Sequence, residues 1–247
     1  MAILQTIQLE KRYGDHAVLK GVDFSLHKGE AVVILGPSGC GKSTFLRCLN
    51  GLEPIQGGKI IFNAQEISAP KIDWNVIRQK IGMVFQNYEL FPHLSVLQNI
   101  SLAPLKVQKK PKEEVEARAI ALLKRVGLEH KKNAYPKELS GGQKQRVAIV
   151  RALCMQPEVM LFDEVTASLD PEMVKEVLEV ILELASEGMS MVIVTHEMKF
   201  ARKVAHRIVF FDQGIVVEEN SPQGFFENPQ SERAQKFLEI FHFLGNC

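Results

Sequence analysis

The sequence predicts an α/β fold with a largely parallel sheet, in a single domain over residues 1–247. From residue 143 onward, short apolar runs alternate with amphipathic stretches of helical period. This alternation is typical of an α/β domain. Ala31–Leu35 is a continuous apolar run that ends at Gly36, as expected for a strand buried on both faces. With 247 residues, 46% of them hydrophobic, the chain can bury a sizeable core.

The first 65 residues or so are predicted to be rich in strands. Four apolar residues at alternating positions indicate a half-buried strand: Val18, Val22, Phe24 and Leu26. Gly57-Gly58 precedes a further short strand at 59–62, and Asn63-Ala64 indicates the turn after it.

The middle of the chain is predicted to be helical. Pro111 precedes an amphipathic segment, and Gly127 follows that segment at the place where a C-cap glycine is common. The buried face of this helix is expected to consist of Val115, Ala119, Leu122 and Val126.

In the second half, Asp170 is expected to be the N-cap of a helix, Pro171 its first residue and Gly188 its end. The other elements predicted there are a helix at 147–155, buried strands at 159–162 and 191–194, and strands at 207–211 and 215–217 around a Gln213-Gly214 turn.

Charge and cysteine content exclude several classes of protein. The 30 Lys+Arg balance 29 Asp+Glu, so no basic surplus points to a nucleic-acid partner. The apolar runs are far shorter than the ~20 residues of a membrane-spanning helix, and the first twelve residues do not resemble a secretory signal. We therefore expect no direct membrane insertion. The cysteines form no C-x-x-C pair, which indicates reduced thiols: Cys40, Cys48, Cys154 and Cys247.

The strongest local motif follows the apolar run 31–35 and matches G-x-x-x-x-G-K-[ST]. It consists of Gly36, Pro37, Ser38, Gly39, Cys40, Gly41, Lys42, Ser43 and Thr44. Its glycines let backbone N–H groups form a nest for phosphate oxygens at the start of a helix, predicted at Lys42–Leu49. Lys42 is expected to reach the β- and γ-phosphates, Ser43 to ligate Mg²⁺ and Thr44 to bond the α-phosphate.

Two acids follow the predicted strand 159–162. The carboxyl ends of parallel strands form the edge at which ligands bind in open α/β sheets. Asp163 and Glu164 are therefore expected beside the phosphate loop. We predict that Asp163 holds Mg²⁺ and that Glu164 is the general base for an attacking water.

A second glycine-rich turn precedes the helix at 147–155, and its members are Leu139, Ser140, Gly141, Gly142 and Gln143. Its N–H groups and the Ser140 hydroxyl could also face a phosphate. Followed by Lys144-Gln145-Arg146, the turn resembles the signature of ATP-binding cassette (ABC) ATPases. The phosphate loop, this turn and the acid pair follow one another in the order that the family shows. The resemblance extends over essentially the whole chain.

The resemblance implies ATP and Mg²⁺ as cofactors and a P-loop NTPase fold of the ABC ATPase type. A RecA-like core with an N-terminal antiparallel β-subdomain is expected over roughly 1–85 and 157–247. A helical subdomain that carries the signature is expected over roughly 86–156.

Further residues resemble family landmarks one by one. Gln86 resembles the Q-loop glutamine that reaches Mg²⁺ and the attacking water, and His196 resembles the switch histidine that contacts the γ-phosphate. Tyr13 resembles the aromatic residue that stacks on adenine, with Val18 supporting the ring or the ribose. Asp170 ends a segment that resembles the D-loop at the interface between two subunits.

One segment departs from the family pattern. Where the family usually has Pro-Thr-Ser-Ala-Leu-Asp after the base, this chain has Val165, Thr166, Ala167, Ser168, Leu169 and Asp170. The departure is expected to affect the rigidity of this loop and its contacts across the interface between two subunits. The magnesium and base positions, Asp163 and Glu164, match the family pattern. Hydrolysis is still expected.

By the same resemblance, the protein is expected to form a head-to-tail homodimer with ATP at the interface. The loop at Lys42 in one chain would face the turn at Ser140 in the other. Loss of the γ-phosphate on hydrolysis would release this contact, which makes the dimer a switch. Separate membrane subunits are the expected load, and the chain would lie peripherally on the cytoplasmic side of the inner membrane.

Residues 87–100 and the tail at 225–229, with Glu232, Arg233, Phe237 and Leu238, resemble importers of polar amino acids. The implied partners are two permease subunits and, indirectly, an extracytoplasmic amino-acid-binding protein. The surface around 86–94 is expected to receive the permease. The competing interpretation of Leu90, Phe91 and Leu94 is ordinary core packing, and some of them are expected to pack in the core.

Three alternatives remain at this point. The first is the ATPase of an ABC exporter, a lipoprotein-release complex or a cell-division complex. The second is a soluble ABC ATPase acting on DNA or ribosomes, which typically carries a long coiled-coil insertion or two cassettes in one chain. The third is a P-loop kinase, disfavoured by the signature turn and by the positions of Gln86 and His196.

Overall fold

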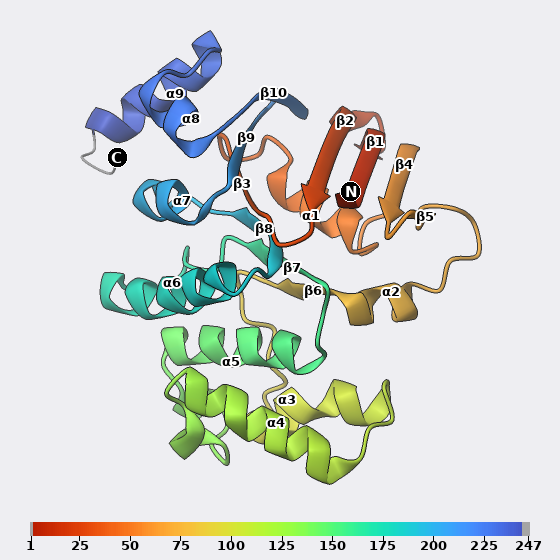
Figure 1. Ribbon diagram of the computed structural model, residues 1–247, viewed down its shortest axis with the longest axis vertical. Helices are drawn as coiled ribbons and strands as arrows, with labels where there is room; N and C mark the ends of the chain where they lie inside the picture. Colours follow the sequence, from red (N-terminus) through yellow and green to blue (C-terminus); the bar gives the residue numbers. More distant parts are fainter. Residues whose placement is uncertain (1, 244–247) are drawn as a thin grey trace.

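A computed structural model describes residues 2–243 (Figure 1). It contains a six-stranded, mostly parallel sheet and a four-stranded antiparallel sheet. Cys247 lies outside the described residues. No helix within 2–243 has the length and apolar character needed to cross a membrane.

The larger sheet forms the centre of the fold. Its strand order is β10-β9-β3-β8-β7-β6, in which β10 alone runs antiparallel to its neighbour. Every residue of β3, β7 and β8 is buried, and all are apolar except Asp163 at the end of β7 and Ser190 at the start of β8. The strands are β3 (Ala31–Leu35), β6 (Ile81–Val84), β7 (Val159–Asp163), β8 (Ser190–Val194), β9 (Arg207–Asp212) and β10 (Ile215–Asn220).

The smaller sheet confirms the predicted antiparallel β-subdomain, with the order β2-β1-β4-β5. Its strands are β1 (Ala2–Tyr13), β2 (His16–His27), β4 (Gly57–Phe62) and β5 (Gln65–Glu66). The alternation predicted for β2 is wrong at one position, because Leu19 is buried and Val18 is only partly buried. Gly21, with φ 81°, follows Leu19 and precedes Val22 in the strand. The pairing of β2 with β1 shifts register near these residues, which interrupts the alternation.

Helices cover both faces of the large sheet, and three of the helices, α3, α4 and α5, form a group below it (Figure 1). The helices are α1 (Lys42–Leu49), α2 (Trp74–Lys80), α3 (Val96–Lys106), α4 (Lys112–Arg125), α5 (Gly141–Cys154), α6 (Pro171–Ser186), α7 (Met198–Val204), α8 (Pro222–Glu227) and α9 (Glu232–Phe243), with short 3-10 turns at Glu129–Lys131 and Pro136–Glu138. The helices α3, α4 and α5 pack on one another and are called the three-helix group below.

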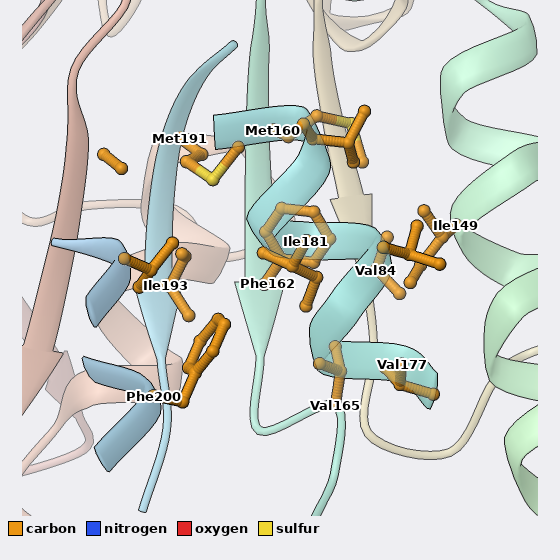
Figure 2. Packing of buried hydrophobic residues seen from close by; sticks show 14 of the residues in the cluster. Val84, Ile149, Met160, Phe162, Val165, Val177, Ile181, Met191, Ile193 and Phe200 are labelled. Carbon is orange, nitrogen blue, oxygen red and sulfur yellow. The ribbon is translucent and has the colours of Figure 1, made fainter. Parts of the chain in front are cut away.

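Residues of the large sheet alternate between two cores. In β3, Ala31, Val33 and Leu35 belong to one core, and Val32 and Ile34 belong to the other. Figure 2 shows the first core, where Ile181 of α6 lies over Phe162 of β7, with Ile193 of β8 close by. These buried strands hold the loops at their carboxyl ends in fixed positions.

Two details of the helices correct the prediction, and a third concerns the predicted N-cap at Asp170. In α4 the buried face continues at Leu123, four residues after Ala119, and Leu122 is only partly buried. The helix expected at 147–155 begins earlier, at Gly141, because Ser140 caps it. Asp170 occupies the N-cap position of α6 but makes no capping hydrogen bond with its side chain.

Candidate functional site

The predicted site residues follow four adjacent strands of the large sheet. The loop at Gly36 follows β3, His196 follows β8, Asp163 and Glu164 end β7, and Gln86 follows β6. Because these strands are parallel neighbours, their carboxyl ends meet at one edge of the sheet.

The loop between β3 and α1 depends on glycine at both ends. A Cβ placed on Gly36 (φ 151°) would lie 2.1 Å from the carbonyl oxygen of Phe211. At Gly41 (φ 107°), a Cβ would lie 3.0 Å from Leu19 Cδ2 and 3.4 Å from Val18 Cγ1. The loop is thus seated tightly against β9 and β2, and α1 begins directly after it with its N–H groups available.

Lys42 is buried in the loop that it follows. Its side chain is 4% exposed, and Nζ donates hydrogen bonds of 2.9 Å to the carbonyl oxygens of Gly36 and Pro37. The ammonium group is therefore held at the first two residues of the loop, where it can reach an anion bound to the loop amides.

Ser43 and Asp163 form a direct link between α1 and β7. The Ser43 hydroxyl donates a 2.6 Å hydrogen bond to Asp163 Oδ1, and Arg47 Nη2 lies 3.9 Å from Oδ2. Burial raises the pKa of Asp163, against the lowering effect of the Ser43 hydrogen bond. A hydroxyl and a carboxylate side by side are the oxygen ligands that Mg²⁺ prefers, so this pair fits that ion.

Glu164 and His196 form a second pair across the edge of the sheet. His196 Nε2 lies 3.0 Å from Glu164 Oε1. Glu164 has a left-handed backbone (φ 47°), and its amide donates to the carbonyl oxygen of Val194 in the neighbouring strand β8. The hydrogen bond with His196 is the main cause that lowers the pKa of Glu164, so the carboxylate form is favoured.

The predicted base-binding residues lie next to the start of α1. The Tyr13 side chain is 47% exposed, and Lys11 Nζ lies 4.6 Å from its ring centroid. Burial and hydrogen bonding with Glu53 raise the pKa of Tyr13, while a hydrogen bond with Thr44 lowers it. The ring therefore lies near the end of the phosphate loop, and Val18 lies against the loop at Gly41.

The predicted signature turn is built as a helix N-terminus. Ser140 Oγ accepts from the amide of Gln143, and Gln143 Oε1 accepts from the amide of Ser140, so the two residues form a capping box. Gly142 packs closely on α6, where a Cβ would lie 2.8 Å from Met173 Cβ. No hydrogen bond or ion pair within 2–243 joins this turn to the loop 36–44.

Gln86 and Asp170 are both exposed. Gln86 lies two residues after the end of β6, and Asp170 lies at the start of α6. The structure does not bring Asp170 to the phosphate loop through any hydrogen bond of the described chain. One charged neighbour of Asp163 was not predicted, namely Arg47. Its position four residues after Ser43, on the same side of α1, was the signal for it.

Comparison with known proteins identifies the family. The family model "ABC transporter" matches residues 19–167. A glutamine transport ATP-binding protein of Geobacillus stearothermophilus is 56% identical over 94% of this chain and 96% of its own length. An arginine transport ATP-binding protein of Bacillus subtilis is 55% identical, over 96% of this chain and 99% of its own length.

Solved structures agree with this match. The cbiO1 protein of Clostridium perfringens, part of an ABC transporter complex, superposes with a TM-score of 0.82 at 32% identity and covers 99% of both chains. The ATP-binding cassette MJ0796, as a dimer bound to ADP and Pi, gives a TM-score of 0.80 at 33% identity and covers 90% of this chain and 99% of that one. By fold, site and sequence, this chain belongs to the ABC transporter family, as an ABC ATPase with the P-loop fold of that family.

Proposed function

We propose that this chain is the ATP-hydrolysing subunit of an importer of polar amino acids. The observation that carries the hydrolytic part is the contact between Glu164 and His196, at the same sheet edge as the phosphate loop. The import part is supported by relatives whose names state glutamine, arginine and, for an Escherichia coli protein 52% identical over 95% of this chain, glutamate/aspartate transport.

In this proposal the loop 36–44 binds the triphosphate of ATP. Its amides and Lys42 hold the β- and γ-phosphates, and the Thr44 hydroxyl holds the α-phosphate. Tyr13, exposed beside Thr44, stacks on adenine, and Val18 supports the ring or the ribose. Ser43, Asp163 and Gln86 would hold Mg²⁺, which would neutralise phosphate charge and orient the phosphates.

Glu164 activates the attacking water. With its pKa lowered, the carboxylate is ionised at neutral pH and accepts the proton as the water oxygen bonds to the γ-phosphorus. The bond from that phosphorus to the bridging oxygen then breaks, and ADP is the leaving group. His196 holds Glu164 in place and lines a cavity with Gly36, Pro37 and Ser38 of the phosphate loop, where it would contact the γ-phosphate.

The complete site is proposed to need two copies of the chain, head to tail. Two features support this: no hydrogen bond joins turn 139–143 to loop 36–44 within the described chain, and MJ0796, of similar fold, has been solved as a dimer. Ser140, Gly141, Gly142 and Gln143 of one copy would then bind the nucleotide held by the other. Asp170, exposed at the start of α6, would lie at this interface.

A groove of about 950 Å³ between the large sheet and the three-helix group is the proposed permease site. Its apolar lining includes Phe85, Phe91, Leu102 and Val107, and basic side chains such as Arg78 stand along it. Phe91 and Val107 are 42% and 49% exposed, whereas Leu90 packs against the core. The proposed partners are two permease subunits. An amphipathic helix of a permease subunit, on its cytoplasmic side, fits this lining. Such a contact would hold the chain peripherally at the membrane.

Capture of the protein with its membrane partners tests this function. The purified complex, reconstituted with an extracytoplasmic binding protein, is assayed for ATPase activity against a panel of amino acids. The proposal predicts stimulation by one or a few polar amino acids and their uptake. Stimulation by lipoprotein, or export of solute, would contradict the import assignment and leave the ATPase assignment intact.

A further inference from the structure

We infer that Tyr88 positions the signature turn and ties it to the segment that carries Gln86, an inference that rests on the two-chain ATP site proposed above. Tyr88 lies 2 residues after Gln86 in the sequence, in the loop between β6 and α3. Nothing in its sequence context suggested a role at the signature turn.

The backbone at Tyr88 is strained and is held from α5. Tyr88 and Glu89 have φ values of 61° and 49°, the left-handed region that non-glycine residues occupy at a cost. Arg151, near the end of α5, donates from Nη2 to the carbonyl oxygen of Tyr88 (3.1 Å) and from Nη1 to that of Glu89. One guanidinium group thus stabilises both strained residues.

A second side chain of α5 holds the start of the same loop. Gln145 is fully buried, and its Nε2 donates a 3.2 Å hydrogen bond to the carbonyl oxygen of Phe85, the residue before Gln86. The loop 85–89 is therefore attached to α5 at three carbonyl oxygens. Because α5 begins at the signature turn, loop and turn are parts of one packed unit.

The Tyr88 side chain closes this unit at the turn itself. A Cβ placed on Gly141 would lie 3.0 Å from Tyr88 Oη and 2.9 Å from Leu169 Cδ2. Gly141 thus packs closely against both the Tyr88 hydroxyl and Leu169 of the D-loop. Burial raises the pKa of Tyr88, so its hydroxyl stays neutral and un-ionised at physiological pH.

This arrangement joins the permease groove to the signature turn by a short route. Phe85, Glu89 and Arg151 line the groove. A displacement of the groove by a bound helix moves the loop 85–89, and Tyr88 carries the movement to Gly141. In the two-chain site, the turn acts on nucleotide bound by the other copy. Loss of the tyrosine should therefore weaken ATP-driven pairing and leave nucleotide binding to the chain's own loop unchanged.

The test measures pairing and nucleotide binding separately, in the full chain with Glu164→Gln to prevent hydrolysis. Light scattering gives the ATP concentration for half-maximal dimer, and a fluorescent ADP, which lacks the γ-phosphate needed for pairing, reports the affinity of the monomer. Tyr88→Ala is expected to raise the ATP concentration for half-maximal dimer about tenfold. The affinity of the monomer for the fluorescent ADP should change less than about twofold. Tyr135→Ala, which removes an exposed tyrosine from the connection between α4 and α5, is the matched control and should change neither.

Tyr88→Phe keeps the ring and loses only the hydroxyl beside Gly141. This variant should raise the ATP concentration for half-maximal dimer about threefold. It replaces Tyr88→Ala in the test if the alanine variant does not fold. Pairing unchanged in the Tyr88 variants, or weakened in parallel with ADP binding, would overturn the inference. If the parent Glu164→Gln chain itself shows no ATP-dependent pairing, the two-chain site is wrong, and the inference is overturned with it.

Discussion

Glu164 Oε1 lies 3.0 Å from His196 Nε2, and this contact joins the carboxyl ends of two neighbouring strands, β7 and β8. A carboxylate fixed in this way has one oxygen engaged with the imidazole and the other free to accept a proton. The backbone of Glu164 is held as well, through its amide and the carbonyl oxygen of Val194. Position and protonation of the proposed base therefore depend on the same two strands.

Glu164→Gln should abolish steady-state hydrolysis while ATP binding persists. The amide is nearly the same size as the carboxylate but cannot accept the proton, so phosphate release should fall at least ~100-fold. Nucleotide affinity, measured by fluorescence, should change little, because the loop 36–44 is untouched. Glu239→Gln, an exposed acid on α9, serves as control. Turnover near the parent level in Glu164→Gln would remove Glu164 as the base.

His196→Ala should move the acid limb of the pH–rate profile upward. The His196 hydrogen bond is the largest cause that lowers the pKa of Glu164 from its ordinary value of 4.5, whereas burial raises it. Without the imidazole, burial dominates and the base becomes protonated at higher pH. Single-turnover hydrolysis between pH 4 and pH 8 measures this shift. An acid limb at the same pH in both proteins would contradict the role of His196.

The same pKa shift predicts how stability depends on pH. Because the pKa of Glu164 is lowered by folding, its contribution to the free energy of unfolding is complete above its ordinary value of 4.5. That contribution is lost as the pH falls through the lower, folded value. Thermal unfolding of the parent and Glu164→Gln proteins should therefore differ at pH 7 and converge in acid. A difference that grows as the pH falls would be the opposite result.

Asp163→Asn should separate metal binding from stability. Burial raises the pKa of Asp163, so its ionised form costs stability above the ordinary carboxyl pKa, and the amide removes this cost. The melting temperature at pH 8 should stay equal or rise, while Mg²⁺-dependent ATP affinity falls about tenfold or more. Binding measured with EDTA should be alike in the two proteins. An equal loss with and without Mg²⁺ would point to damage of the loop instead.

Alkylation of Cys40 should block nucleotide binding, and ATP should protect the thiol. Cys40 lies within the phosphate loop at 7% exposure, and burial raises its pKa, so labelling should be slow at pH 7 and faster at pH 9. Cys48, with its pKa raised to about 12, and Cys154 are both fully buried and serve as internal controls. A Cys247→Ser background removes the remaining thiol. Cys40 labelling at the same rate with and without ATP would contradict its placement.

The sequence was sufficient for those parts of the site that depend on local spacing. The loop 36–44 and the capping box of Ser140 and Gln143 are contiguous segments whose residue types determine their backbone. Asp163 and Glu164 could be placed beside the loop because parallel strands share a carboxyl edge. The general α/β order followed from the alternating apolar runs.

Contacts between distant segments could not be predicted in the same way. Arg151 reaches the carbonyl oxygen of Tyr88 across 63 residues, and the partner is a backbone atom that leaves no trace in residue type. In α4 the structure buries Leu123 where the sequence predicted Leu122. Which of the two is buried depends on the rotation of α4 about its axis against α3 and α5, and helical periodicity alone does not define that rotation. The bounds of α3, within the segment predicted to be helical, could not be derived, because Pro104 lies inside the helix and weakens the helical pattern.

The most direct test is a structure of the Glu164→Gln protein crystallised with ATP and Mg²⁺. We predict a dimer in which the Ser140 hydroxyl and the amide of Gly142 from one copy lie within hydrogen-bonding distance of the terminal phosphate bound by Lys42 of the other. A nucleotide whose terminal phosphate touches residues of its own chain alone, at saturating ATP, would contradict the shared site and the switch built on it.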